Sequence, residues 1–325
     1  MNDTRKRRPT LQDIADLTGV TKMTVSRYLR DPSAVAEGTR ERIAAAVEEL
    51  GYIPNRAPDM LSNATSKAIG ILIPSLSNQV FSAVIHGIEA VTRPAGYQTL
   101  LAHYGYSPER EEEQVASLLS YNVDGLILSD TQHTERTRKM IATAGIPVVE
   151  TMDLPLSPID MVVGMDHRAA ARAMVTEMLR RGRRKVIYLG ARLDVRTQLR
   201  MEGYYQAMAD FGLTGQHLLT EQSSSFTLGG ELLAQAMARF PDLDGLFCTN
   251  DDLAVGALLQ CQARWIPVPQ QVAIAGSNAL DIGHAMTPKL ASIVTPRETI
   301  GREAAIMLLA RLGGPPPLSY THLPA

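Results

Sequence analysis

Apolar and polar positions between residues 10 and 29 recur with a helical period and predict two short helices joined by a tight turn. Leu11, Ile14, Ala15 and Val20 are the apolar positions that face inward. Gly19 stands where the chain has to turn sharply, and glycine adopts a positive φ without strain. The spacing therefore predicts a first helix that ends near Gly19 and a second helix that starts directly after it.

The second predicted helix has an apolar back and a polar, cationic front. Thr21 can cap its first turn through the side-chain oxygen, and Val25 and Leu29 share the apolar face because they are four residues apart. The opposite face carries Lys22, Met23, Ser26, Arg27 and Arg30. A helix of this kind, pressed on a partner helix, is how a helix-turn-helix presents residues to the major groove of DNA. The alternative is a helical hairpin whose charged face is only solvated.

A third helix is predicted over Glu37–Leu50, where Ile43 and Val47 belong to one apolar stripe and Gly51 is a suitable stop. Ala36 before it has no side-chain acceptor, so the helix start is expected to be uncapped. The third helix and a basic arm at residues 5–8 favour the DNA-binding interpretation over the solvated hairpin.

The polar stretch of residues 55–67 is predicted to be a hinge. Asn55 can cap a short helix over Arg56–Ser62, with Pro58 in the first turn, where proline is tolerated. A helix of about two turns is unstable alone in water, so the alternative is a flexible linker. We therefore expect a DNA-binding head over residues 1–54, a hinge over 55–67 and a core over 68–325.

From Ala68 onward, short apolar runs alternate with stretches of helical length. The predicted strands are Ile69–Ile73, Gln98–Ala102, Gly125–Leu128, Val148–Glu150, Met161–Val163, Lys185–Leu189, Gly245–Cys248 and Val272–Ala275. The predicted helices are Val80–Arg93, Glu109–Ser120, Arg168–Arg180, Thr197–Phe211, Gly229–Arg239 and Leu253–Ala263. Such alternation implies parallel sheets with helices on both faces, and the stretch is long enough for two lobes. The expected fold class is an all-α helix-turn-helix head followed by an α/β core of two parallel-sheet lobes, with a ligand in the crevice at the strands' C-terminal ends.

Composition and charge narrow the classes of function. With 45% hydrophobic and 20% charged residues and a net charge of −2, the chain is globular and not globally basic. Its only two cysteines, Cys248 and Cys261, lack metal-ligand spacing and argue against a disulfide framework. The N-terminal residues lack an apolar segment, so we expect no secretory signal, and no run of residues is apolar enough to span a membrane. We expect a cytoplasmic protein with no metal or cofactor and, since no nucleophile–base pair or phosphate-binding glycine loop is visible, no enzymatic activity.

The assembled motifs resemble the lactose-repressor family of bacterial regulators. The resemblance covers nearly the whole chain and is carried by LQDIADLTGVTKMTVSRYL, TRERIAAAVEELGYIPNRAPDMLSNAT, FCTNDDLAVGAL and PRETIGREAA. It implies a periplasmic-binding-protein-like core and a homodimer on a near-palindromic operator in double-stranded DNA. VTKMTVSR, LAHYGY, YLGARLD and EQSSS are similar to family members that regulate gluconate utilisation.

The resemblance implies a set of DNA contacts. Lys22 and Met23 contact base edges, where lysine suits guanine and methionine suits a thymine methyl, and Arg27 reaches a base or a phosphate. Leu61 matches the family's wedge, which enters the minor groove at the operator centre. Phosphate contacts are expected from Leu11 (through backbone amides), Thr21, Thr24, Ser26, Asn55 and Arg56.

The resemblance also implies an effector pocket suited to an acid. Family members with neutral sugar ligands carry two carboxylates where this chain has Ser277-Asn278-Ala279; a carboxylate would repel an anion, whereas Asn278 tolerates one. Arg200 is expected to clamp the ligand carboxylate, and Arg297 to add a second cation. Further pocket residues are expected to be Asn78, Gln79, Phe81, Asp166, Ser225 and Asn250. For Asp166 and Asn250, helix capping is the alternative role.

Three functional alternatives stay open on the sequence. The ligand can be another sugar or a sugar phosphate, or it can act as a corepressor that promotes DNA binding. A secreted sugar-binding protein would have the same two lobes, but the head and the missing signal disfavour it. We expect a repressor that gluconate or a related sugar acid releases from its operator.

Overall fold

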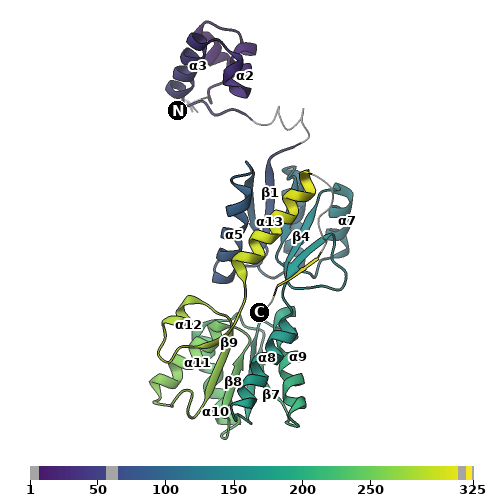
Figure 1. Cartoon of the computed structure of the whole chain (residues 1–325), viewed down its shortest axis with the longest axis vertical. Coiled ribbons are helices and arrows are strands. Elements are labelled where there is room, and N and C mark those ends of the chain that lie inside the picture. Colours follow the sequence, from purple (N-terminus) through teal and green to yellow (C-terminus); the bar gives the residue numbers. More distant parts are fainter. Residues whose placement is uncertain (1–6, 56–64, 314–319, 324–325) are drawn as a thin grey trace, which may run out of the picture. The chain divides into compact units, whose positions relative to one another are not determined.

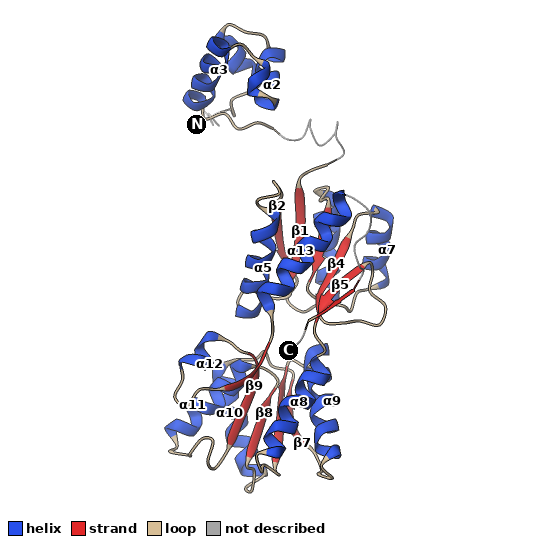
Figure 2. Cartoon of the chain, in the orientation of Figure 1, coloured by secondary structure: helices blue, strands red, loops and turns tan. Residues whose placement is uncertain are grey.

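The computed structural model describes residues 7–55, 65–313 and 320–323 of the chain. The chain divides into two compact units, Met1–Ser66 and Lys67–Ala325. Figure 1 labels the elements, and Figure 2 separates helices from strands. No helix among the described residues is both long and apolar enough to cross a membrane.

The first unit contains the predicted helices α1 (Leu11–Thr18), α2 (Lys22–Arg30) and α3 (Glu37–Leu50), with a 3₁₀ turn, η1 (Pro32–Ala34), before the third. Ile14, Val25 and Ile43 are fully buried between the helices, with Ala46 and Tyr52 beside them. The predicted local signals are confirmed, because Gly19 ends α1 at a φ of 67° and the Thr21 side chain accepts a hydrogen bond from the Thr24 amide. Ala36 provides no side-chain cap for α3, as expected.

The second unit has two lobes, each built on a parallel sheet. The N-lobe sheet has the strand order β11-β5-β4-β3-β1-β2 and the C-lobe sheet the order β10-β9-β8-β6-β7. The N-lobe elements are β1 (Ala68–Ile73), α5 (Gln79–Thr92), β2 (Gln98–His103), α6 (Pro108–Ser120), β3 (Gly125–Leu128), α7 (Glu135–Ala144), β4 (Val148–Met152), β5 (Met161–Gly164), α13 (Arg297–Gly313) and β11 (Tyr320–His322). The C-lobe elements are α8 (His167–Arg180), β6 (Val186–Ala191), α9 (Val195–Asp210), β7 (Gln216–Thr220), α10 (Phe226–Arg239), β8 (Gly245–Cys248), α11 (Asp251–Ala263), β9 (Ala273–Asn278), α12 (Asp281–Ala285) and β10 (Ala291–Val294).

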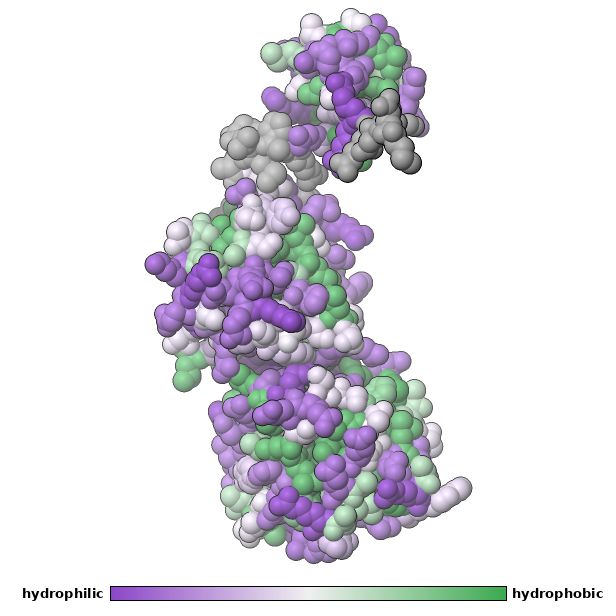
Figure 3. Space-filling model, turned by 180° about the vertical axis from the view of Figure 1, so that it is seen from behind, coloured by the Kyte–Doolittle hydropathy of each residue, from purple (hydrophilic) through white to green (hydrophobic). Residues whose placement is uncertain are grey.

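Helices cover both faces of each sheet, so the central strands are apolar along their whole length. In β1, Ile69, Ile71 and Ile73 pack under α5 and α13, while Leu72 packs on the α6 side. In β6, Leu189 packs under α10 and α11, while Tyr188 packs under α8 and α9. These alternating contacts follow from the two-residue period of a strand and give each face of each sheet its own hydrophobic core. The face drawn in Figure 3 mixes polar and apolar residues on the surface of both lobes.

The N-lobe helices α5 and α13, which lie side by side in Figure 1, pack backbone against backbone. A Cβ added to Gly87 would lie 2.1 Å from the Glu298 carbonyl oxygen, and one added to Gly301 would lie 2.0 Å from that of Val84. Only glycine fits at such a contact, since any larger residue would force the helices apart. This packing joins two segments of the N-lobe that are far apart in the sequence.

Every strand and helix predicted for the core is present, and the predicted fold class is confirmed. The prediction missed the peripheral elements β7, β10, β11, α7, α12 and α13. It also started several helices too late; α8 begins at His167 and not at Arg168, and α10 begins at Phe226 and not at Gly229. Asp166, Asp194, Ser225 and Asn250 cap the first turns of α8, α9, α10 and α11.

Candidate functional site

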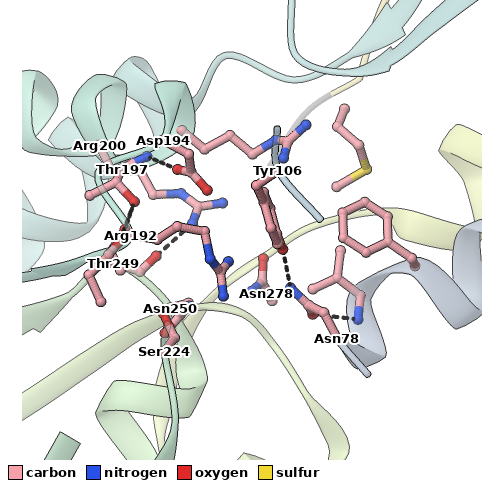
Figure 4. A pocket seen from close by; sticks show the side chains of 15 residues that line it. Asn78, Tyr106, Arg192, Asp194, Thr197, Arg200, Ser224, Thr249, Asn250 and Asn278 are labelled. Atoms are coloured by element: carbon pink, nitrogen blue, oxygen red, sulfur yellow. Dashed lines mark hydrogen bonds between the residues drawn. The ribbon is translucent and has the colours of Figure 1, made fainter. Parts of the chain in front are cut away.

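A polar cavity lies between the two lobes of the core, at the C-terminal ends of the sheet strands. It encloses about 420 Å³ of space free of protein atoms, including its open mouth. The residues that line it are Asn78, Val80, Phe81, Tyr106, Met152, Ala191, Arg192, Asp194, Arg196, Thr197, Arg200, Ser224, Thr249, Asn250 and Asn278. Figure 4 shows that side chains from both lobes point into the same space. The position agrees with the crevice expected for a ligand.

Helix N-termini meet at this cavity. Asn78 caps α5, Asp194 caps α9 and Asn250 caps α11, and in each cap the side-chain oxygen accepts a hydrogen bond from a backbone amide of the first turn. A helix N-terminus carries a partial positive charge and favours an anion. The backbone therefore gives the cavity an electrostatic preference for anionic ligands before any charged side chain is considered.

Arg200 on α9 is buried, with 6% of its surface exposed. Its Nη1 donates to the Thr249 carbonyl oxygen at 2.6 Å, and its Nη2 lies 3.2 Å from Nδ1 of His167. Burial and the charge of Arg200 lower the pKa of His167, so the imidazole is neutral and its Nδ1 accepts. Nε2 of His167 then carries the proton and faces the Met152 carbonyl oxygen at 3.1 Å. Arg200 thus lines the cavity but already has two protein partners.

Arg196, also on α9, reaches from the C-lobe to the N-lobe. Its Nη2 lies 2.9 Å from Asp153 Oδ2 and donates to the Ser129 carbonyl oxygen. Burial alone would raise the pKa of Asp153, but Arg196 and His167 together outweigh burial and lower that pKa. His167 lies on the other side of the same carboxylate, with Nε2 3.2 Å from Asp153 Oδ1. The two lobes are therefore joined beside the cavity by a buried ion pair.

A third arginine, Arg192, enters the cavity from the loop between β6 and α9. Its guanidinium lies over the ring of Tyr106, 4.0 Å from the ring centroid. Arg192 and Leu193 have φ values of 67° and 55°, and Asn278 across the cavity has 113°. Such values are strained for residues with a side chain and gather at binding sites. The sequence-based prediction missed Arg192 and Arg196, although their positions just after a predicted strand, in the GARLDVR segment, were a usable signal.

The structure brings five of the predicted effector residues into the cavity: Asn78, Phe81, Arg200, Asn250 and Asn278. Asn250 does so while capping α11, and its Nδ2 donates to Ser224 Oγ at 2.8 Å. Asn278 is buried and accepts from the Thr295 hydroxyl at 3.3 Å. Both roles weighed for Asn250, cap and pocket residue, are therefore structurally compatible.

The other four predicted effector residues do not line the cavity. Asp166 is exposed and caps α8, and Ser225 caps α10 while its neighbour Ser224 takes the place at the cavity. Gln79 lies in the outer hollow next to the cavity. Arg297 donates to the Ala279 carbonyl oxygen at 3.2 Å and is held at the loop after β9. The side chains of Asp166, Ser225 and Arg297 are used in helix capping or loop bonding because each stands at the start of a helix.

The front face of α2 in the first unit is open. Thr21, Lys22, Met23 and Arg27 are exposed, while Thr24 and Ser26 are partly buried. Met23 is 72% exposed, so its apolar side chain is available to an apolar group of a partner. Leu11 is partly buried at the start of α1, and Asn55 is exposed. Arg56 and Leu61 lie outside the described residues.

Family models match both parts of the chain. Residues 10–55 match the family model of bacterial regulatory proteins, lacI family, and residues 66–316 match that of periplasmic binding proteins and the sugar binding domain of the LacI family. The HTH-type transcriptional regulator GntR of Escherichia coli K12 is 58% identical over 95% of this chain and 94% of its own length. The regulator IdnR of the same organism is 53% identical over 95% and 93%.

A solved structure extends the similarity to the whole fold. The structure of a LacI-family transcriptional regulator from Silicibacter pomeroyi superposes with a TM-score of 0.91 at 35% identity, over 97% of this chain and 96% of the other. The head and the two-lobed core therefore occur together in a known regulator. The chain belongs to the lacI family of bacterial regulatory proteins.

Proposed function

We propose that this regulator represses genes of sugar-acid utilisation and leaves its operator when gluconate, or a closely related sugar acid, binds between the lobes. The observation that carries the proposal is the cavity itself, which combines helix N-termini, arginines and uncharged Asn278 in place of a carboxylate. Its amide and hydroxyl groups, from Asn78, Asn250 and Ser224, suit the hydroxyls of a linear sugar acid. The proposed function is one of binding, with no catalytic step and no cofactor or metal.

The proposal includes a homodimer on a near-palindromic operator, in the cytoplasm. One helix-turn-helix reads one half-site, so two-fold symmetric DNA calls for two copies of the head. The similarity to gluconate-responsive family members and the 58% identity to a regulator named GntR support this choice of ligand and mode of action. No group of side chains among the described residues is arranged to hold a metal ion.

Titration of an operator complex with gluconate at fixed salt tests the function. We expect the affinity for operator to fall about 5- to 150-fold at saturating gluconate, the usual range of coupling between two sites. Glucose, which lacks the carboxylate, is the control and should leave operator binding unchanged. Unchanged binding with gluconate would remove the inducer assignment, and tighter binding would instead show a corepressor; 6-phosphogluconate is the next ligand to test.

Replacing Lys22 with alanine should relax the base preference of the operator at one position. The exposed ammonium at the start of α2 is expected to contact a guanine edge, and a good base contact is worth about 1–3 kcal/mol of discrimination. The measurement is binding to a set of operators with single base changes. Arg56→Ala is the comparison, because the phosphate contact expected from Arg56 should weaken all operators alike. Equal losses across the set for both variants would contradict a base-reading role for Lys22.

A further inference from the structure

Three arginines line the cavity, and their existing contacts distinguish them. Arg200 is held by Thr249 and His167, and Arg196 by Asp153 and Ser129. The guanidinium of Arg192 lies over the ring of Tyr106 and acts on the charge of Asp252. The buried Nε atoms of Arg192 and Arg196 both lack a hydrogen-bond partner among the described residues, but Arg196 is held through Nη2. A buried donor without a partner is costly. Of the three, only the Arg192 side chain makes no hydrogen bond or ion pair with another described residue, so it is the one whose donors are most available to a ligand.

The position of Arg192 is fixed by its backbone. The amide donates to the Gln222 carbonyl oxygen at 3.0 Å, and the residue keeps a left-handed conformation with a φ of 67°. This conformation costs free energy for a residue with a side chain, so the surrounding structure has to impose it. In Figure 4 the side chain extends beside Tyr106 toward Asn250 and Asn278, into the space where a ligand would lie.

Tyr106 holds the arginine from the opposite lobe. It follows β2 in the N-lobe, and its hydroxyl accepts a hydrogen bond from Asn78 Nδ2 at 3.3 Å, whereas Arg192 belongs to the C-lobe. Both residues line the inner cavity and also an outer hollow of about 1240 Å³, a volume that includes open solvent at its mouth. The Arg192–Tyr106 pair therefore stands at the boundary between the two spaces and spans the two lobes.

We propose that Arg192, and not Arg200, binds the carboxylate of the ligand, with Tyr106 holding the guanidinium across the cleft. The geometry allows both contacts at once, because a guanidinium stacks through its face and binds a carboxylate bidentately through its edge. Arg192 belongs to the C-lobe and Tyr106 to the N-lobe, so a ligand carboxylate bound to Arg192 adds to a contact between the lobes. Binding of an acid is thereby linked to the relative position of the lobes. The inference rests on the proposed sugar-acid function and names the residue that makes the site selective for acids.

Calorimetric titration with gluconate and with its neutral amide, gluconamide, separates the two proposals. The wild-type protein should bind gluconate more tightly than gluconamide. Arg192→Ala should weaken gluconate binding about 10- to 100-fold, as expected for lost hydrogen bonds to a charged group. The same variant should bind gluconamide with nearly the wild-type affinity. Tyr106→Leu should weaken gluconate binding about 2- to 5-fold, the range of an exposed cation–π contact, and Tyr106→Phe should bind more tightly than Tyr106→Leu. A loss of the preference for the acid is a result that general unfolding would not produce.

Arg239→Ala is the matched control. Arg239 also lies over an aromatic ring, that of Phe240 at 5.4 Å, but it is exposed and outside the cavity, so its removal should leave both titrations unchanged. If the wild type binds gluconate and Arg192→Ala retains both the affinity and the preference for the acid, the assignment of Arg192 is wrong and the sugar-acid function stands. If the wild type binds no gluconate, both proposals are wrong.

Discussion

Replacing His133 with alanine should lower the free energy of unfolding by about 3–5 kcal/mol, the cost of removing one partner from a buried ion pair. His133 lies in the N-lobe between two carboxylates. Its Nδ1 is 2.9 Å from Glu111 Oε2 on α6, and its Nε2 is 3.3 Å from Glu150 Oε1 on β4. All three side chains are almost completely buried. Without the imidazole, two carboxylates would face each other in the core.

The pH dependence of stability provides a second readout for His133. Burial alone would lower the pKa of His133, but its contacts with Glu111 and Glu150 outweigh burial and raise it to about 9, from a usual 6.5. Because the pKa of His133 is raised in the folded state, the stabilisation that its protonated form provides is fully present below pH 6.5. It is lost as the pH rises through 9. We therefore expect the wild type to lose stability over this window and the His133→Ala variant to lack that part of the loss.

Urea unfolding of the full chain at several pH values measures both effects. His86→Ala is the control, since His86 is exposed on α5 and its loss should change stability little. His133→Gln, which keeps a polar group of similar reach, serves if the alanine variant does not fold. If the His133 variants are as stable as the wild type and show the same pH profile, the prediction is wrong. That result would mean that Glu111 and Glu150 are neutral when the imidazole is absent.

The parts of the fold that the sequence predicts are those fixed by local pattern. The head helices were placed within a residue because Thr21 and Gly19 set their ends and Val25 and Ile43 mark their buried faces. The central strands stand out because they are buried on both sides. The edge strands β7 and β10 are partly exposed and show no continuous apolar run, and α7 has only Thr137 and Ile141 as buried positions. Exposure at the edge of a sheet thus removes the pattern on which prediction depends.

The cavity was predicted less completely, for a different physical reason. Position along the chain places Asn78, Asn250 and Asn278 at strand ends, and in the structure these side chains line the cavity. Sequence alone does not say which arginine has spare donors. That depends on contacts between lobes, such as Arg196 with Asp153, that no periodicity encodes. The sequence predicts Arg200 as the clamp, and in the structure two of its nitrogens, Nη1 and Nη2, already have partners in the protein.

The contact between the lobes leads to the second large effect. Asp153→Asn should destabilise the core by about 3–5 kcal/mol, because it leaves the guanidinium of Arg196 buried without its counter-charge. The carboxylate is 2% exposed and the arginine side chain 11%. Since the pKa of Asp153 is lowered in the folded state, its contribution is present above the usual value of 3.8 and is lost as the pH falls through the folded value. The variant should accordingly lack that part of the acid-induced loss of stability.

Asp210→Asn is the matched control for this prediction. Asp210 pairs with Arg172 at 2.7 Å, and both side chains of this pair are about half exposed. The buried pair of Asp153 and Arg196 is slightly longer, at 2.9 Å. An exposed pair is worth about 0–1 kcal/mol, so this variant should remain near wild-type stability.

Because Asp153 and Arg196 belong to different lobes, Asp153→Asn should also weaken the release of operator by gluconate, which Asp210→Asn should leave intact. Equal stabilities of the two variants would show that burial does not set the strength of the interlobe pair, and unaltered release in Asp153→Asn would separate that pair from the ligand response.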